Sequence, residues 1–127
     1  MLNKIHHVAI ICSDYQRSKS FYVETLGLEV IKETYRKERN SYKLDLRIGE
    51  TEQIELFSFQ GTPERPSYPE ARGLRHLAFE VNDIDSVKKS LEDKEIVVEP
   101  IRVDELTGKK YTFFQDPDGL PLELYES

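Results

Sequence analysis

The sequence predicts an α+β fold built from two βαβββ modules, because it contains an internal repeat in which strand-like and helix-like segments follow the same order. The stretches "IHHVAIICSDYQRSKSFY" and "LRHLAFEVNDIDSVKKSL" both read as an apolar strand, an Asp and an amphipathic segment. In each stretch the Asp comes seven residues after a His: His7 and Asp14 in the first, His76 and Asp83 in the second. Only two copies are visible, which favours a duplicated supersecondary unit over a longer array.

The first module is expected to begin with a strand over residues 5–12, which alternates and is rich in β-branched side chains. Asp14 or Ser13 can cap a following helix, because a short oxygen-bearing side chain accepts the free N–H groups of a first turn. Glycine commonly ends a helix in the left-handed conformation, so this helix should stop before Gly27. Three further strands are predicted over residues 28–35, 42–48 and 53–59.

The second module is expected to repeat this order after a strand that ends near Val81. Asp83 precedes "IDSVKKSLEDK", in which apolar residues recur at helical spacing. Three strands should follow over residues 96–103, 110–115 and 120–125.

Between the modules lies "QGTPERPSYPEARG", whose three prolines and two glycines disfavour regular structure. We therefore expect residues 1–127 to form a single domain, in which modules 4–60 and 74–126 are joined by the Pro-rich linker 60–73.

The charge balance bounds the partners of the protein. Its 18 Lys and Arg against 24 Asp and Glu give a net charge of −6, which disfavours binding to nucleic acid or to an anionic membrane. The opening "MLNKIHHVAIIC" is neither a signal sequence nor a membrane span. Cys12 is the single cysteine and forms no internal disulfide, which suits a reducing compartment. We expect a cytoplasmic protein whose ligand is a small molecule.

Two histidines and two glutamates lie at matching positions in the modules and on the polar face of apolar strands. Glu55 alternates with Ile54 and Leu56, and Glu123 alternates with Leu122 and Leu124. Each histidine is followed two residues later by an alanine. Taken singly, such residues are more often ordinary strand surface, but the repetition favours a shared site. Imidazole and carboxylate groups together suit a divalent Ni, Zn, Co, Mn or Fe ion.

The segments "HHVAI", "QIELFSF", "RHLAFEV" and "DPDGLPLELYE" resemble the vicinal oxygen chelate superfamily, also called the glyoxalase, bleomycin resistance and dioxygenase superfamily. The resemblance covers nearly the whole chain and looks especially close to its small bacterial glyoxalase-I-like proteins. The most specific part is the DPDG turn, which in this family precedes a metal-binding Glu four residues after the Gly. The resemblance implies that the modules form a cupped, incomplete β-barrel with four metal ligands: His7, Glu55, His76 and Glu123.

The resemblance also implies a homodimer. Two arrangements of the site remain open at this stage. In one, all four ligands belong to a single chain; in the other, His7 and Glu55 of one chain meet His76 and Glu123 of its partner.

The implied activity is that of a metal-dependent lyase or isomerase acting on a small substrate with adjacent oxygens, as in lactoylglutathione lyase. Glu123 or Glu55 would act as the catalytic base. Where glutathione-using relatives carry an Arg and an Asn, this chain has Ile11 and Phe59, which disfavours glutathione as co-substrate.

Other members of the superfamily supply three alternative functions: a metal-dependent epimerase, a dioxygenase, or a non-catalytic protein that binds a drug or metabolite. Four ligands are more than a dioxygenase site needs, and the drug-binding members characteristically lack them. Arg39 and Arg102 are additional candidates for holding an acidic group of the substrate.

Overall fold

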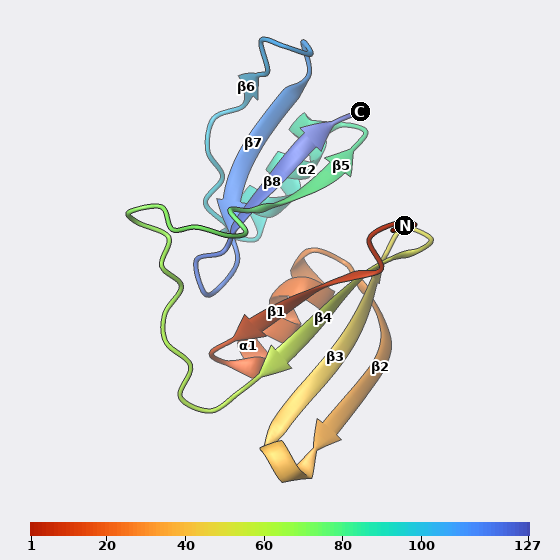
Figure 1. The fold of residues 1–127 in the computed structure, drawn as a ribbon. Helices are drawn as coiled ribbons and strands as arrows, with labels where there is room; N and C mark the ends of the chain where they lie inside the picture. Colours follow the sequence, from red (N-terminus) through yellow and green to blue (C-terminus); the bar gives the residue numbers. More distant parts are fainter. The chain divides into compact units, whose positions relative to one another are not determined.

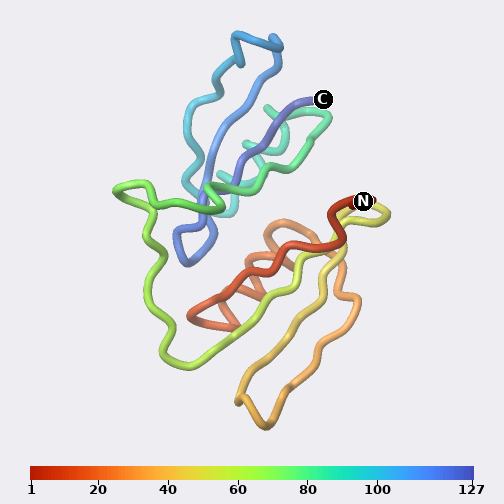
Figure 2. The backbone as a smooth tube through the Cα atoms, in the orientation of Figure 1, coloured from red at the N-terminus to blue at the C-terminus, as the bar shows by residue number.

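The structure is a computed structural model that describes all 127 residues, and the chain divides into two compact units, Met1–Pro63 and Glu64–Ser127. Each unit contains a four-stranded mixed sheet and a helix in the order βαβββ (Figure 1). The predicted α+β fold with two such modules is therefore confirmed. Residues 59–76, which include the Pro-rich stretch, contain no helix or strand and run as an irregular connection (Figure 2).

The first unit matches the predicted order of elements to within two residues at each strand end. Its sheet has the order β1-β4-β3-β2, in which β1 and β4 are parallel and the other neighbours are antiparallel. The helix continues into a π-helical turn, and a 3₁₀ turn joins β2 to β3. The elements are β1 (His7–Cys12), α1 (Tyr15–Ser20), the π turn (Phe21–Thr25), β2 (Glu29–Arg36), the 3₁₀ turn (Lys37–Arg39), β3 (Ser41–Ile48) and β4 (Glu52–Ser58).

The second unit repeats the sheet in the order β5-β8-β7-β6, again with its first and last strands parallel. Its elements are β5 (Leu77–Val81), α2 (Ile84–Asp93), β6 (Arg102–Val103), β7 (Lys110–Gln115) and β8 (Pro121–Glu126).

The strand predicted over residues 96–103 is wrong for most of its length, because only Arg102–Val103 is regular strand. Glu95 has a positive φ of 65°, and Pro100 has no N–H to donate to a ladder. The segment instead follows β7 through separate hydrogen bonds. The N–H of Glu99 donates to the carbonyl of Phe113 at 3.0 Å, and the hydroxyl of Thr112 donates to the carbonyl of Glu99 at 2.7 Å.

Both predicted helix caps are confirmed. The side chain of Asp14 accepts a hydrogen bond from the N–H of Arg17, and Asp83 accepts one from Ser86, each at 3.1 Å. Neither helix is both long and apolar enough to cross a membrane.

The core of each unit lies between its helix and one face of its sheet (Figure 1). In the first sheet the inward rows of β1, β3 and β4 are buried, and in the second the same holds for β7 and β8. Alternation then leaves the histidine and glutamate of each unit on the opposite, open face, as the sequence predicted. The buried apolar strand residues are Ile10, Cys12, Leu44, Leu46, Ile54, Leu56, Phe114, Leu122 and Leu124.

Helix α1 is tied to strand β2 by a polar contact at the edge of the core. The hydroxyl of Tyr15 donates to Glu33 Oε2 at 2.5 Å, and Lys19 Nζ donates to the same oxygen at 2.8 Å. The ring of Tyr15 also stacks on Tyr42 with centroids 4.3 Å apart. Burial and the hydrogen bond to Glu33 raise the pKa of Tyr15 above its usual range. The hydrogen bonds from Lys19 and Tyr15 lower the pKa of Glu33.

This contact makes the stability of the first unit depend on pH. Because the pKa of Glu33 in the folded protein is below its usual value of 4.5, its carboxylate stabilises the fold above that pH, and this contribution is lost as the pH falls through the folded pKa. We expect Glu33→Gln to lower the free energy of unfolding by about 1 kcal/mol at pH 7, since the charge that strengthens the contacts with Tyr15 and Lys19 at a partly exposed site is lost. Urea unfolding at pH 7 and at steps below pH 4.5 measures this.

The exposed loop residue Glu105 provides the matched control. Glu105→Gln should leave unfolding unchanged. The difference between Glu33→Gln and the parent protein should shrink in acid. A difference of constant size at every pH would contradict the assignment.

Candidate metal centre

The first unit holds a His–Glu pair on two neighbouring parallel strands. His7 is the first residue of β1, and Glu55 lies in the middle of β4 directly beside Ala9. His7 Nε2 is 3.4 Å from Glu55 Oε2, and the two side chains are 39% and 14% exposed. The pair is therefore reachable from solvent on the open face of the sheet.

His6 contacts the other nitrogen of His7. The Nδ1 atoms of the two rings lie 2.9 Å apart, and the rings meet edge to face. One of the two nitrogens carries the hydrogen that joins them. When that hydrogen belongs to His7, its Nε2 has a free lone pair on the side of Glu55, which is the state that a metal ligand requires.

The second unit holds the equivalent pair. His76 lies immediately before β5, and Glu123 lies in β8 directly beside Ala78. His76 Nε2 is 2.8 Å from Glu123 Oε2, and the side chains are 28% and 12% exposed. The ring of Phe113 stands edge to face against His76 with centroids 5.1 Å apart. The Nδ1 atom of His76 is buried and has no hydrogen-bond partner, so Nε2 is the engaged atom of this ring.

The four residues singled out from the sequence are thus brought together in pairs, one pair within each unit. The register is the same in both: the alanine two residues after the histidine lies beside the glutamate. The internal repeat predicted one histidine and one glutamate on the same face of each module, and that placement is observed.

The donor atoms of each pair fit the coordination sphere of one divalent ion. Donors about 2.1 Å from a common ion lie about 3.0 Å apart at a right angle and about 3.4 Å apart at the tetrahedral angle. The observed Nε2–Oε2 distances are 3.4 Å and 2.8 Å. Imidazole nitrogen with carboxylate oxygen is also the donor set that Zn and neighbouring transition ions accept.

The surroundings of the two glutamates differ, and the sequence analysis missed this difference. Lys43 Nζ lies 3.4 Å from Asp45 Oδ1 and 3.8 Å from Glu55 Oε2. The strand register places Tyr111 and Phe113 at the equivalent positions of the second unit. The signal was present in β3, where charged residues alternate with the buried leucines 44 and 46.

Each open face also carries an arginine over two aromatic rings. The guanidinium carbon of Arg102 lies 5.0 Å from the ring centre of Tyr111 and 5.6 Å from that of Phe113. In the first unit the arginine over two rings is Arg36, one same-face position further along its strand, whereas Arg39, which the sequence suggested, lies exposed in the turn after β2.

The turn before β8 fixes the start of the strand that carries Glu123. The buried carboxylate of Asp116 accepts hydrogen bonds from the N–H groups of Asp118 and Leu120, both at 2.9 Å. Gly119 has a φ of 83°, which side chains rarely allow. The DPDG turn therefore fixes where β8 begins and, with it, the position of Glu123.

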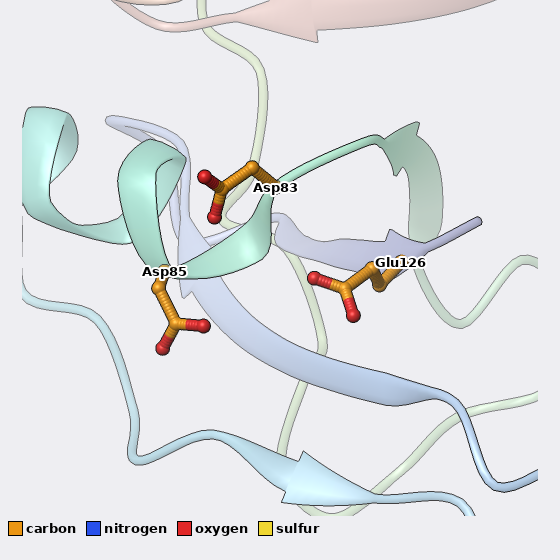
Figure 3. Close-up of side chains that lie close together, drawn as sticks. All are labelled: Asp83, Asp85 and Glu126. Atoms are coloured by element: carbon orange, nitrogen blue, oxygen red, sulfur yellow. The ribbon is translucent and has the colours of Figure 1, made fainter.

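An acidic group lies elsewhere, at the start of α2, where Asp83, Asp85 and Glu126 bring carboxylate oxygens within 4.8 Å of one another (Figure 3). Its members already have other partners. Asp83 caps the helix, Glu126 accepts from the N–H of Ile84 at 3.0 Å, and Asp85 Oδ2 lies 3.3 Å from Lys110 Nζ. These contacts account for the cluster as part of the helix start.

This interpretation predicts the behaviour of Asp83→Ala. Loss of the cap should lower the free energy of unfolding by about 1 kcal/mol, while the divalent metal content of the folded protein stays that of the parent. Urea unfolding together with elemental analysis measures both quantities. A folded Asp83→Ala protein that had lost its metal would contradict the interpretation.

Comparison with known proteins identifies the family. The model of the Glyoxalase/Bleomycin resistance protein/Dioxygenase superfamily matches residues 4–124, and the chain belongs to this superfamily. The superfamily contains enzymes such as glyoxalase I, and its members commonly bind divalent metals and small-molecule substrates.

Three relatives illustrate the range of similarity. The uncharacterized protein YwkD of Bacillus subtilis (strain 168) is 62% identical over 126 residues, which cover 99% of this chain and 98% of YwkD. The crystal structure of a glyoxalase family protein from Enterococcus faecalis has 58% identity and a TM-score of 0.90, with 97% of each chain covered. The trypanothione-dependent glyoxalase I of Leishmania major has 25% identity and a TM-score of 0.74, covering 98% of this chain and 87% of that one.

Proposed function

We propose that the protein is a divalent-metal-dependent lyase or isomerase of the glyoxalase type, acting on a small substrate with two adjacent oxygen atoms. The repeated His–Glu pair carries the proposal, because its donor atoms lie 3.4 Å and 2.8 Å apart at equivalent positions. In this proposal modules 4–60 and 74–126 act as one domain. The ligands of a Ni, Zn, Co, Mn or Fe ion are His7, Glu55, His76 and Glu123.

Such an ion, when bound, supplies a Lewis acid that polarises two adjacent substrate oxygens and stabilises the negative charge that develops on them. The carboxylates of the chain handle the proton. One glutamate removes the proton from the carbon beside the substrate carbonyl and returns it to the adjacent carbon.

We assign this proton transfer to Glu123 and a ligand role to Glu55. Lys43 Nζ lies 3.8 Å from Glu55 Oε2 and restrains that carboxylate by its charge. Glu123 has no lysine beside it and lies against Phe113 on the neighbouring strand, so no positive side chain opposes its taking up the substrate proton.

The proposal predicts the effect of Glu123→Gln on turnover. Metal-stripped protein is reconstituted separately with Ni, Co, Zn and Mn and offered methylglyoxal hemithioacetals of glutathione and of other small thiols. We expect turnover with at least one thiol, and a fall of about 100-fold or more in kcat for Glu123→Gln, because a general base contributes on that order. The exposed helix residue Glu92 supplies the control variant Glu92→Gln, which should keep full activity.

Two outcomes count against this proposal. If the parent protein binds no divalent ion tightly, the proposed metal centre is wrong. If the Glu123→Gln protein turns over substrate as fast as the parent, Glu123 is not the catalytic base.

We further propose that the protein is a homodimer in which His7 and Glu55 of one chain face His76 and Glu123 of its partner, the arrangement known for small glyoxalases. Mixing two inactive variants, His7→Ala and His76→Ala, after unfolding and refolding them together tests this. In an equal mixture half of the dimers are mixed, and each mixed dimer has one intact site of two, so about a quarter of the parent activity should return. No recovery above the separate variants would instead assign all four ligands to one chain.

A further inference from the structure

We propose that Arg36 is the anion-binding residue of this site, and that the substrate therefore carries a carboxylate or phosphate group in addition to its adjacent oxygens. This inference rests on the proposed function, since it extends the candidate metal centre along the open face of the first sheet. Arg36 is not one of the candidate metal ligands.

Arg36 lies on the same face of the sheet as Glu55. It is the last residue of β2 and pairs with Ser41 across the hairpin. Two residues earlier, Thr34 pairs with Lys43, and Lys43 pairs with Phe57 of β4. Because paired strand residues share a face, Arg36 belongs to the face that carries Glu55, Phe57 and Phe59.

Two aromatic rings and one hydroxyl hold the guanidinium group in place. Its central carbon lies 4.9 Å from the ring centre of Phe57 and 5.5 Å from that of Phe59. The two rings are nearly parallel, with centroids 5.6 Å apart. Nη2 of Arg36 donates to the hydroxyl of Ser41 at 3.0 Å. Cation–π contact and this hydrogen bond leave the planar group with one preferred orientation.

The charge of Arg36 has no counter-ion within the protein. The side chain is half-buried, yet of its five N–H donors only the one to Ser41 has an acceptor, and the buried Nε has none. Two other cations of this face are neutralised: Lys43 by Asp45, and Arg47 by Glu29 at 2.6 Å. Partly buried charges are normally paired, so an unpaired and orientated guanidinium is suited to receive an anionic ligand.

The surroundings of Arg36 favour the same sign of ligand. A hollow of about 370 Å³ is lined by Arg36, Lys37, Glu38 and Arg39, three cations and one carboxylate. The net charge of the whole protein is −6, so this end of the sheet is a local positive region in an acidic molecule. Such a region concentrates small anions.

Phe57 connects Arg36 with Glu55 on this face, because the guanidinium carbon of Arg36 lies 4.9 Å from its ring centre. Phe57 follows Glu55 on the same face of β4, and same-face neighbours on a strand are about 7 Å apart. A substrate whose adjacent oxygens reach the metal can therefore place a distal anionic group against Arg36. A neutral substrate of the same length would leave the guanidinium unpaired.

Matched pairs of compounds test the inference by calorimetry on the zinc-loaded protein. The pairs are 2-oxoglutarate against 2-oxobutyrate for a carboxylate, and dihydroxyacetone phosphate against dihydroxyacetone for a phosphate. We expect the distal anion in one pair to tighten binding by about tenfold or more, as one charge-assisted contact implies. The pair that shows the effect identifies the anion.

The variant Arg36→Gln should abolish this advantage, whereas Arg17→Gln should retain it. Arg17 is exposed on helix α1 of the same unit, so its loss changes the charge equally without touching the open face. If Arg36→Gln does not fold, the inference is tested by comparing the affinities of the paired compounds for the parent protein. Equal binding within both pairs, or an advantage that survives in folded Arg36→Gln, would overturn the inference.

A measurement without metal separates this inference from the proposed function. In metal-free protein, inorganic phosphate or acetate should shift the Nε–Hε nuclear magnetic resonance signal of Arg36. A shifted signal in protein that binds no divalent ion would support the anion site and refute the metal centre. A protein that binds one equivalent of metal, but whose Arg36 signal does not shift and which binds both members of each compound pair equally, would support the metal centre and refute the anion site.

Discussion

Each unit of this protein depends on the parallel pairing of its first strand with its last strand, β1 with β4 and β5 with β8. This pairing puts Ala9 beside Glu55 and Ala78 beside Glu123, so that the histidine two residues before each alanine reaches the glutamate. A slip of one residue would turn each glutamate into the core and expose its leucine neighbours. The buried rows of β4 and β8 therefore hold the candidate ligands on the open face.

The order of the elements and the face on which each histidine and glutamate lies could be predicted from the sequence because both follow from local patterns. Alternation of apolar residues assigns a face to every strand residue, and the repeat of that pattern shows that the arrangement occurs twice. Asp14 and Asp83 could be assigned as caps for the same reason, since a cap bonds to residues of its own first turn.

The other features depend on which strand residues lie opposite one another, and no local pattern encodes that. Lys43 approaches Glu55 only through the register of β3 with β4, and Arg36 of β2 reaches Phe57 of β4 across the intervening strand β3. The predicted strand over residues 96–103 failed because Pro100 and the positive φ of Glu95 outweigh its β-branched composition. Sequence periodicity identifies faces well and contacts across a face poorly.

Under the proposed function, the repeat supplies equivalent donors in unlike surroundings. Charged groups surround Glu55, whereas Tyr111 and Phe113 occupy the equivalent positions near Glu123. The same donor atoms from each unit suit one metal ion, and the different residues around Glu55 and Glu123 suit a substrate whose two ends differ. This division explains how one duplicated module can provide a common metal centre and a directional binding site.

The central claim is that the two His–Glu pairs bind one ion together, and anomalous X-ray scattering from crystals grown with zinc tests it most directly. The account predicts a single strong peak per site, bonded to Nε2 of both His7 and His76 and to the carboxylates of Glu55 and Glu123. Separate peaks at the two pairs, or a peak only among Asp83, Asp85 and Glu126, would contradict it.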